Sequence, residues 1–237
     1  MALPFFYHSI LTESASNFEL DEATSKHVVQ VLRMKTGEKI QLTNGKGLVA
    51  IAEIVSSNKK SCTVTITESV EQPSAAKRRV GIAISPVKNS SRFEWFLEKA
   101  TELGVTDIYP LLCIRTEREH FRYDRMNAIC ISAMLQSQQS WLPILHHSFG
   151  FNNLVEKENT YQHKWIAHCT EDEKQPLVSS ITNAMYDSLI LIGPEGDFTP
   201  EEINLAIVNG YRPVALGDTR LRTETAGMVV ATLLSLC

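Results

Sequence analysis

The sequence predicts a mixed α/β protein in two parts: a small β-rich domain over residues 1–72 and an α/β domain with a parallel sheet over residues 73–237. Three observations predict this two-part organisation. Residues 39–43, 48–55 and 61–67 alternate apolar and polar side chains, as half-buried strands do. After residue 80, short apolar runs alternate with segments of helical period. Residues 68–77, which contain Pro73 and a Ser-Ala-Ala run, separate the two patterns as a predicted linker.

The first part is predicted to contain several short strands and one helix, which indicates a small barrel. Phe5–Tyr7 is an aromatic strand, and residues 22–34 are a helix with Val28, Val31 and Leu32 facing inward. Residues 44–47, with the sequence NGKG, predict a hairpin turn because Asn and Gly tolerate positive φ.

The second part alternates strands and helices. We expect strands at 80–85, 107–112, 141–145 and 164–168, and helices at 122–138 and 175–184. A further helix is expected to begin with a capping box at residues 91–94, since Ser91 and Glu94 have the required spacing. This βαβ pattern predicts a parallel sheet with right-handed crossovers.

The C-terminal stretch, residues 188–231, carries the strongest signals for a site. A strand at 189–192 ends in the loop GPEGD, and a helix follows with Thr199 as N-cap, Pro200 at its first position and Glu202 completing a capping box. A second strand at 213–216 ends at Gly217, before a polar loop and an apolar helix. We expect the two strands to lie side by side, so that both loops meet at the carboxyl edge of the sheet, where open α/β sheets bind ligands. The same glycines are equally explained by packing.

Composition excludes several classes of protein. The net charge of −4 argues against RNA binding by bulk electrostatics, although a local basic face is compatible with it. Five cysteines without a C-x-x-C pair indicate reduced thiols in a cytoplasmic protein, and the histidine spacing predicts no metal site. No apolar run approaches the roughly 20 residues of a membrane span, and the first residues do not form a signal peptide.

Neither loop matches a nucleotide fingerprint. Three segments instead resemble the RsmE family, which methylates N3 of a uridine in 16S rRNA, at position 1498 of that RNA: LIGPEGDFTPEE, LGDTRLRTETA and EKATELGV. The resemblance covers nearly the whole chain. It implies a SPOUT-type domain with a C-terminal trefoil knot, S-adenosylmethionine as cofactor, a homodimer formed through the knotted domain, and a PUA-like N-terminal barrel that binds RNA of the 30S subunit. Two departures are Asp197, where the family commonly has glycine, and the absence of the usual Gly-Arg after Gln139.

The resemblance and the residue types together define a candidate site. The predicted cofactor-binding residues are Leu191, Ile192, Gly193, Pro194, Glu195, Gly196, Leu216, Gly217, Leu221, Thr223, Thr225 and Ala226. Arg222 is the predicted catalytic donor to the developing oxyanion of the base, because a guanidinium is always charged. Glu224 is its predicted partner or the base, and the alternative is a purely structural Arg222–Glu224 pair. The predicted RNA-binding residues are His27, Arg33 and Arg220.

Two other functions fit the same residues. One is 2′-O-ribose methylation of RNA, which requires no deprotonation of a base. The other is a non-enzymatic RNA-binding or ribosome assembly factor, which would not bind S-adenosylmethionine.

Overall fold

The structure is a computed structural model, and it describes residues 3–13, 17–58, 61–74, 76, 78–117, 121–157, 160–171, 174–181 and 186–236. The chain divides into two compact units, the first formed by Met1–Ser74 with Met134–Leu142 and the second by Ala75–Ala133 with Pro143–Cys237. The sequence did not predict that Met134–Leu142 belongs to the first unit. Gly47 N donates to Ser140 O at 2.9 Å, and Leu142 N donates to Gly45 O at 2.8 Å, which fixes this segment there.

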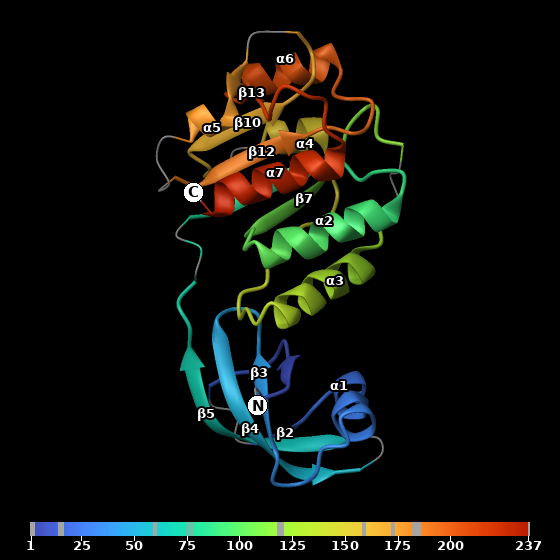
Figure 1. The fold of residues 1–237 in the computed structure, drawn as a ribbon, viewed down its shortest axis with the longest axis vertical. Helices are drawn as coiled ribbons and strands as arrows, with labels where there is room; N and C mark the ends of the chain where they lie inside the picture. Colours follow the sequence, from blue (N-terminus) through green and yellow to red (C-terminus); the bar gives the residue numbers. More distant parts are fainter. Residues whose placement is uncertain are drawn as a thin grey trace. The chain divides into compact units, whose positions relative to one another are not determined.

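The first unit contains a five-stranded sheet in the order β1-β3-β4-β5-β2 (Figure 1). β1 pairs with β3 in parallel, and the other pairs are antiparallel. β1 and β2 lie at the two ends of this order, so closure into a barrel stays a prediction. β5 continues through residues 68–71, which the sequence assigned to the linker. The strands are β1 (Phe5–Tyr7), β2 (Asn17–Glu19), β3 (Lys39–Thr43), β4 (Leu48–Ser57) and β5 (Cys62–Glu71).

The helix of the first unit is shorter than predicted. α1 (Glu22–Lys26) runs into a π-helical turn, η1 (His27–Val31), in which Leu32 N donates to His27 O. Val28 is buried as expected, but Val31 is 66% exposed and Leu32 is 41% exposed, so their predicted inward orientation is wrong. A π turn contains more residues than an α turn, and it therefore rotates the following side chains off the α-helical period.

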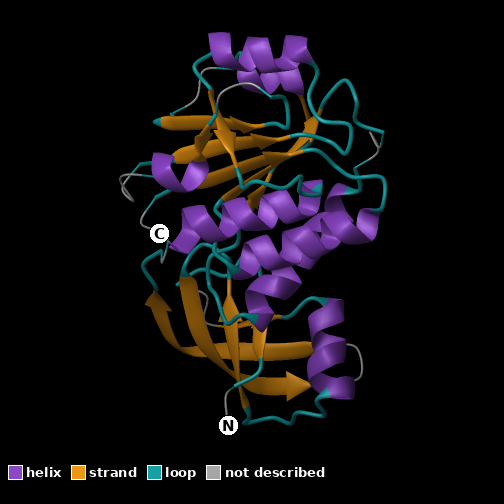
Figure 2. Ribbon diagram, turned by 45° about the horizontal axis from the view of Figure 1, so that its top comes forward, coloured by secondary structure: helices purple, strands orange, loops and turns teal. Residues whose placement is uncertain are grey.

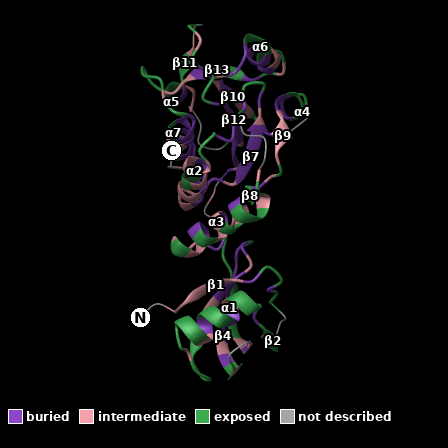
Figure 3. Ribbon diagram, turned by 90° about the vertical axis from the view of Figure 1, so that its right-hand side faces the viewer, coloured by how far each residue is buried: buried purple, intermediate pink, exposed green. Residues whose placement is uncertain are grey.

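The second unit contains a parallel sheet in the order β11-β13-β10-β12-β6-β7-β8, with β9 paired to β7. β12 is buried along its whole length (Figure 3). The predicted strand at 141–145 is reduced to two residues, because Trp141 bridges to Lys46 in the first unit. The strands are β6 (Val80–Ile84), β7 (Asp107–Leu112), β8 (Ile144–Leu145), β9 (Phe149–Gly150), β10 (His163–Ala167), β11 (Gln175–Pro176), β12 (Ser188–Ile192) and β13 (Arg212–Ala215).

One topological expectation is wrong: β12 and β13 are not neighbours. β10 lies between them and pairs in parallel with both. The connection through α6 therefore crosses over β10, whereas the sequence argument treated consecutive strands as adjacent.

Helices cover both faces of this sheet (Figure 2). α2 and α7 pack together on one face, with α7 against β6 and β12, while α4 and α6 lie on the other. The helices are α2 (Ser90–Glu102), α3 (Tyr123–Gln136), α4 (Phe151–Val155), α5 (Leu177–Ser180), α6 (Pro200–Val208) and α7 (Thr223–Leu236). In the described part of the chain, no helix is long and apolar enough to cross a membrane.

One of the two predicted capping boxes is present. The capping box of α6 is present, since Thr199 accepts from Glu202 N and the Glu202 carboxylate accepts from Thr199 N. The predicted box at Ser91 is wrong, because Asn89 is the N-cap of α2 and accepts from Ser91 N at 3.0 Å. The predicted helix at 175–184 is reduced to α5, and residues 182–185 lie outside the described residues.

Candidate active site

A cavity of about 600 Å³ lies where three parallel strands end, β13, β10 and β12. This volume is in the usual range for small-molecule sites, and the carboxyl edge is where such sheets bind ligands. Each strand contributes the residues that follow it. The lining residues are Ala167, His168, Cys169, Lys174, Ile192, Gly193, Pro194, Glu195, Asp197, Val214, Ala215, Leu216, Gly217, Asp218, Thr219, Arg220, Leu221, Arg222, Thr223 and Ala226.

The loop after β12 is held from several sides through its carbonyl groups. Thr223 Oγ1 donates to Gly193 O at 3.0 Å, and Arg220 Nη2 donates to Glu195 O at 3.4 Å. Arg115 Nη1 donates to Gly196 O at 2.7 Å. These donors come from separate parts of the chain, so the loop after β12 is anchored at several points.

Glu195 also has a partner outside the cavity. Its Oε1 accepts from Lys88 N at 3.2 Å, in the loop after β6. This hydrogen bond connects the loop after β12 to the loop after β6.

The loop after β13 begins with a residue that must be glycine. Gly217 has φ of 145°, a conformation that other residues rarely adopt, and a Cβ added there would meet nothing within 4 Å. The main chain is therefore open to the cavity at this point. Arg222 is exposed, and its guanidinium makes no hydrogen bond or ion pair with the described residues. The Arg222 guanidinium can therefore contact a molecule bound at the rim of the cavity.

Four predicted site residues do not line the cavity. Leu191 is fully buried in the core, and Gly196 lies beneath the Arg115 side chain, whose Cδ would be 3.4 Å from an added Cβ. Thr225 is exposed on α7. Glu224 is largely buried, and its Oε1 is 3.7 Å from Arg92 Nε. Its partner is therefore Arg92, and the proposed Arg222–Glu224 pair is absent.

The other predicted cofactor residues, together with Arg222 and Arg220, are among the lining residues. Four cavity residues at or after the end of β10 were not predicted from the sequence: Ala167, His168, Cys169 and Lys174. No motif marks them, and only the position of β10 between β12 and β13 could have indicated them.

The two predicted RNA-binding residues of the first unit are both exposed. His27 also contacts Phe6, with the rings 5.6 Å apart in an edge-to-face arrangement. Arg33 has φ of 56°, an uncommon value for a residue other than glycine. The contact with RNA stays a prediction for both.

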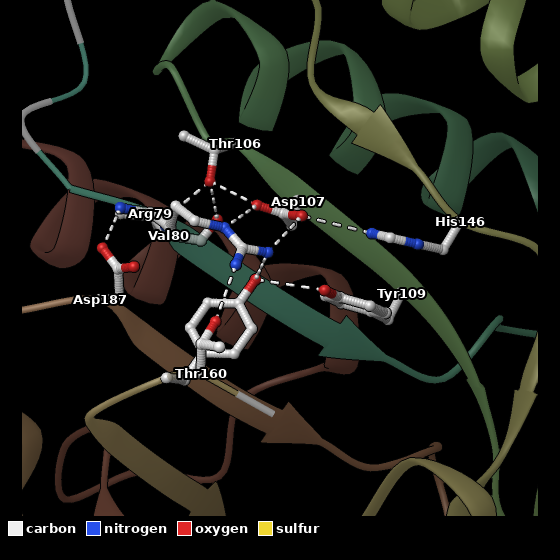
Figure 4. A network of polar contacts seen from close by, with 9 residues as sticks. Arg79, Val80, Thr106, Asp107, Tyr109, His146, Thr160 and Asp187 are labelled. Carbon is white, nitrogen blue, oxygen red and sulfur yellow. Dashed lines mark hydrogen bonds and ion pairs between the residues drawn. The ribbon is translucent and has the colours of Figure 1, made fainter. Parts of the chain in front are cut away.

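A second polar cluster lies at the opposite, amino-terminal edge of the sheet (Figure 4). Asp107 is buried, and Arg79 Nη2 donates to its Oδ1 at 3.0 Å, while His146 Nε2 lies 3.3 Å from the same oxygen. Burial raises the pKa of Asp107, but hydrogen bonds from His146, Arg79 and Thr106 outweigh it and lower the pKa to about 2. The cluster joins the starts of β6 and β7, so we interpret it as structural. The described residues contain no group of three His, Cys, Asp or Glu side chains that could hold a metal ion.

Comparison with known proteins identifies the family. Residues 74–235 match the model of an RNA methyltransferase domain, and residues 20–67 match that of an RNA methyltransferase PUA domain. A Synechocystis protein named ribosomal RNA small subunit methyltransferase E is 30% identical, over 89% of this chain and 70% of its own length. The chain belongs to the RsmE family. It thereby joins a family of RNA methyltransferases, as the two C-terminal motifs predicted.

Solved structures agree with the RsmE assignment. A probable rRNA methyltransferase from Porphyromonas gingivalis is 34% identical, with a TM-score of 0.91 over 99% of both chains. The small subunit methyltransferase E of Neisseria gonorrhoeae, solved with S-adenosylmethionine, is 26% identical, with a TM-score of 0.85 over 98% of this chain and 96% of that one.

Proposed function

We propose that this chain transfers the methyl group of S-adenosylmethionine to N3 of a uridine in 16S rRNA of the small ribosomal subunit. The observation that carries the proposal is the cavity at the carboxyl ends of β13, β10 and β12, with the free guanidinium of Arg222 at its rim. The Neisseria relative that was solved with this cofactor supports the choice of donor, and the names of the relatives support the choice of RNA.

The cavity suits the proposed donor. Ile192, Leu216 and Leu221 supply apolar walls for an adenine ring, and the open main chain at Gly217 supplies polar groups at close range. Bound there, S-adenosylmethionine would supply an electrophilic methyl group on a positively charged sulfur.

The chain's own residues have two tasks in this reaction. N3 of uridine is largely protonated at neutral pH, so its proton must leave and the charge that spreads to the ring carbonyls must be stabilised. We assign the second task to Arg222, because a guanidinium donates several hydrogen bonds to a developing oxyanion. The base stays open: Glu224 was predicted for it, but Glu224 lies outside the cavity lining and pairs with Arg92.

We further propose a division of labour between the parts of the chain. Residues 1–72 would bind rRNA as a PUA-like domain through His27 and Arg33, and residues 73–237 would form a SPOUT-type knotted domain that carries out the chemistry. Dimerisation through the second domain is supported by α7, which leaves Met228, Val229 and Leu233 partly exposed. Light scattering of the purified protein tests the dimer.

The direct test combines product analysis with one substitution. Labelled methyl transfer to 30S particles and to free 16S rRNA from an unmethylated strain, followed by nucleoside mass spectrometry, distinguishes N3-methyluridine from a 2′-O-methyl product. Absence of both transfer and cofactor binding would favour an assembly factor. Arg222→Ala should lower kcat by about 100-fold or more, the usual cost of removing an oxyanion donor, with donor affinity unchanged by calorimetry.

Arg212→Ala is the matched control, because Arg212 is exposed on β13 and does not line the cavity. Loss of donor affinity together with turnover in Arg222→Ala would make Arg222 a structural residue. Glu224→Gln in the same assay tests the base: unchanged turnover would remove Glu224 from the chemistry.

A further inference from the structure

One carboxylate joins two of the three loops around the cavity. Asp197 Oδ2 accepts from Cys169 N at 2.8 Å, and Asp197 Oδ1 accepts from Phe198 N at 2.8 Å. Cys169 follows β10 and Asp197 follows β12, and the last residues of these strands, Ala167 and Ile192, are register partners. Cys169 and Asp197 both line the cavity. The side chain of Asp197 therefore connects the two loops where both of them border the cavity.

The main chain around Asp197 is fixed on both sides. Asp197 has φ of 62°, a left-handed conformation that Asp tolerates better than most residues. Its N–H donates to Pro194 O at 3.0 Å. Arg115 Nη1 donates to Gly196 O and, at 3.3 Å, to Phe198 O, the carbonyls before and after Asp197. These contacts hold the carboxylate in one orientation.

The described residues after β10 contact one another. Lys174 Nζ donates to His168 O at 3.0 Å and also to Thr170 O, while Thr170 Oγ1 is 2.6 Å from His168 Nδ1. These contacts hold the residues on both sides of the Cys169 N–H. The hydrogen bond from Cys169 to Asp197 therefore determines the separation of the two loops, while the bond from Phe198 orients the carboxylate.

We propose that Asp197 is a positioning residue for the methyl donor: its carboxylate fixes the separation of the loops after β10 and β12 and thereby the width of the cavity. The inference rests on the proposed function, because it takes the cavity as the donor site. Both carboxylate oxygens are required, since each accepts from a different N–H. An asparagine has one acceptor oxygen, and its amide NH2 would face a donor.

Two substitutions distinguish this positioning role from the alternative that Asp197 is present only because Asp tolerates a positive φ. Asp197→Gly relieves the positive φ but removes both acceptors, and Asp197→Asn keeps the shape but removes one acceptor. Each should raise KM for S-adenosylmethionine by roughly tenfold, the scale of one lost charge-assisted hydrogen bond. The values of kcat and of KM for rRNA should stay within about twofold. Hydrogen exchange of the Cys169 amide should become faster in both variants.

Glu156→Gln is the control for the loss of one negative charge, since Glu156 is exposed and lies outside the cavity lining. A wild-type KM for the donor in Asp197→Asn, with the Cys169 amide still protected, overturns the inference while leaving the proposed function intact. A wild-type chain that neither binds the donor nor transfers methyl groups overturns the proposed function itself. If Asp197→Gly does not fold, Asp197→Asn decides the question.

Discussion

Gly227 lies in the second turn of α7, and its replacement by alanine should destabilise the second unit. A Cβ at this position would be 2.6 Å from Phe96 Cε2 and 2.9 Å from Ile84 Cδ1. Carbon atoms in contact are normally about 3.5–4.0 Å apart, so α7 or the Phe96 ring must move by about 1 Å. Phe96 and Ile84 are both fully buried, which leaves little room for that movement.

The expected cost follows from two opposing effects. Overpacking of a core costs about 1–3 kcal/mol, and we take the upper part of that range, about 2–3 kcal/mol, because both neighbouring side chains are fully buried. Alanine in a helix recovers about 1 kcal/mol relative to glycine. We expect a net loss of about 1–2 kcal/mol in the free energy of unfolding, which corresponds to a decrease in Tm of roughly 2–8 °C for a domain of this size. A shift of α7 would also lengthen the 3.0 Å hydrogen bond from Thr223 to Gly193 O, and donor affinity should fall with stability.

Urea and thermal unfolding measure the effect, and Gly150→Ala is the matched control. Gly150 is the N-cap of α4 with φ of −63°, and its nearest neighbour to an added Cβ is Asn153 Nδ2 at 3.7 Å. This control should lose roughly 0.5–1 kcal/mol, the usual difference between Gly and Ala at an N-cap, and it carries no packing cost. Equal stability of Gly227→Ala and the wild type would show that the packing argument is wrong.

Two further predictions concern pH and the separation of the units. Since the pKa of Asp107 is about 2 in the folded chain, against an ordinary value of 3.8, its ionised form stabilises the fold above pH 4, and this contribution is lost as the pH falls toward 2. Asp107→Asn should lower the free energy of unfolding by about 2 kcal/mol at pH 7, and the stability of this variant should fall less steeply between pH 4 and pH 2. An equally steep fall in the variant would contradict the prediction. Deletion of residues 1–74 uncovers Trp141 and Leu142, which lie against Gly47 and Gly45, and removes Gln72 O, the acceptor of Trp141 Nε1 at 3.1 Å. The remaining chain should therefore aggregate through this newly exposed apolar surface. The same deletion with Trp141→Lys and Leu142→Gln should stay soluble, bind the donor and lose rRNA affinity; undiminished rRNA affinity contradicts the division of labour.

Elements fixed by local chemistry were predictable from sequence. The Thr199–Glu202 capping box requires only residues three positions apart, and it is present. The strands at 39–43 and 107–112 have the predicted ends, because alternation or an apolar run bounded by turn residues is sufficient to define them. The loops after β12 and β13, two of the three that line the cavity, were found for the same reason.

Features that depend on distant segments were not predictable. The position of β10 between β12 and β13 is determined by packing of the whole sheet, and the local pattern of Lys164–Ala167 contains no information about its neighbours. The partner of Glu224 is Arg92, more than a hundred positions earlier in the chain. The hydrogen bond from Cys169 to Asp197 likewise joins residues with no common motif. The π turn at His27–Val31 departs from the α-helical period, so a prediction from that period placed Val31 and Leu32 on the wrong face.

The insertion of β10 also determines the dimensions of the site. Neighbouring strands are about 4.8 Å apart, so the ends of β12 and β13 are separated by about 10 Å across β10. A molecule held between the two motif loops would rest on a floor made by Ala167–Cys169, a segment that neither motif includes. Substitutions in that floor would change the depth of the cavity while both motif sequences, GPEG and LRTETA, stay the same. Chains that share both motifs can therefore differ in the donors and donor-like inhibitors that they accept, and selective inhibitors of this chain would be designed against its floor.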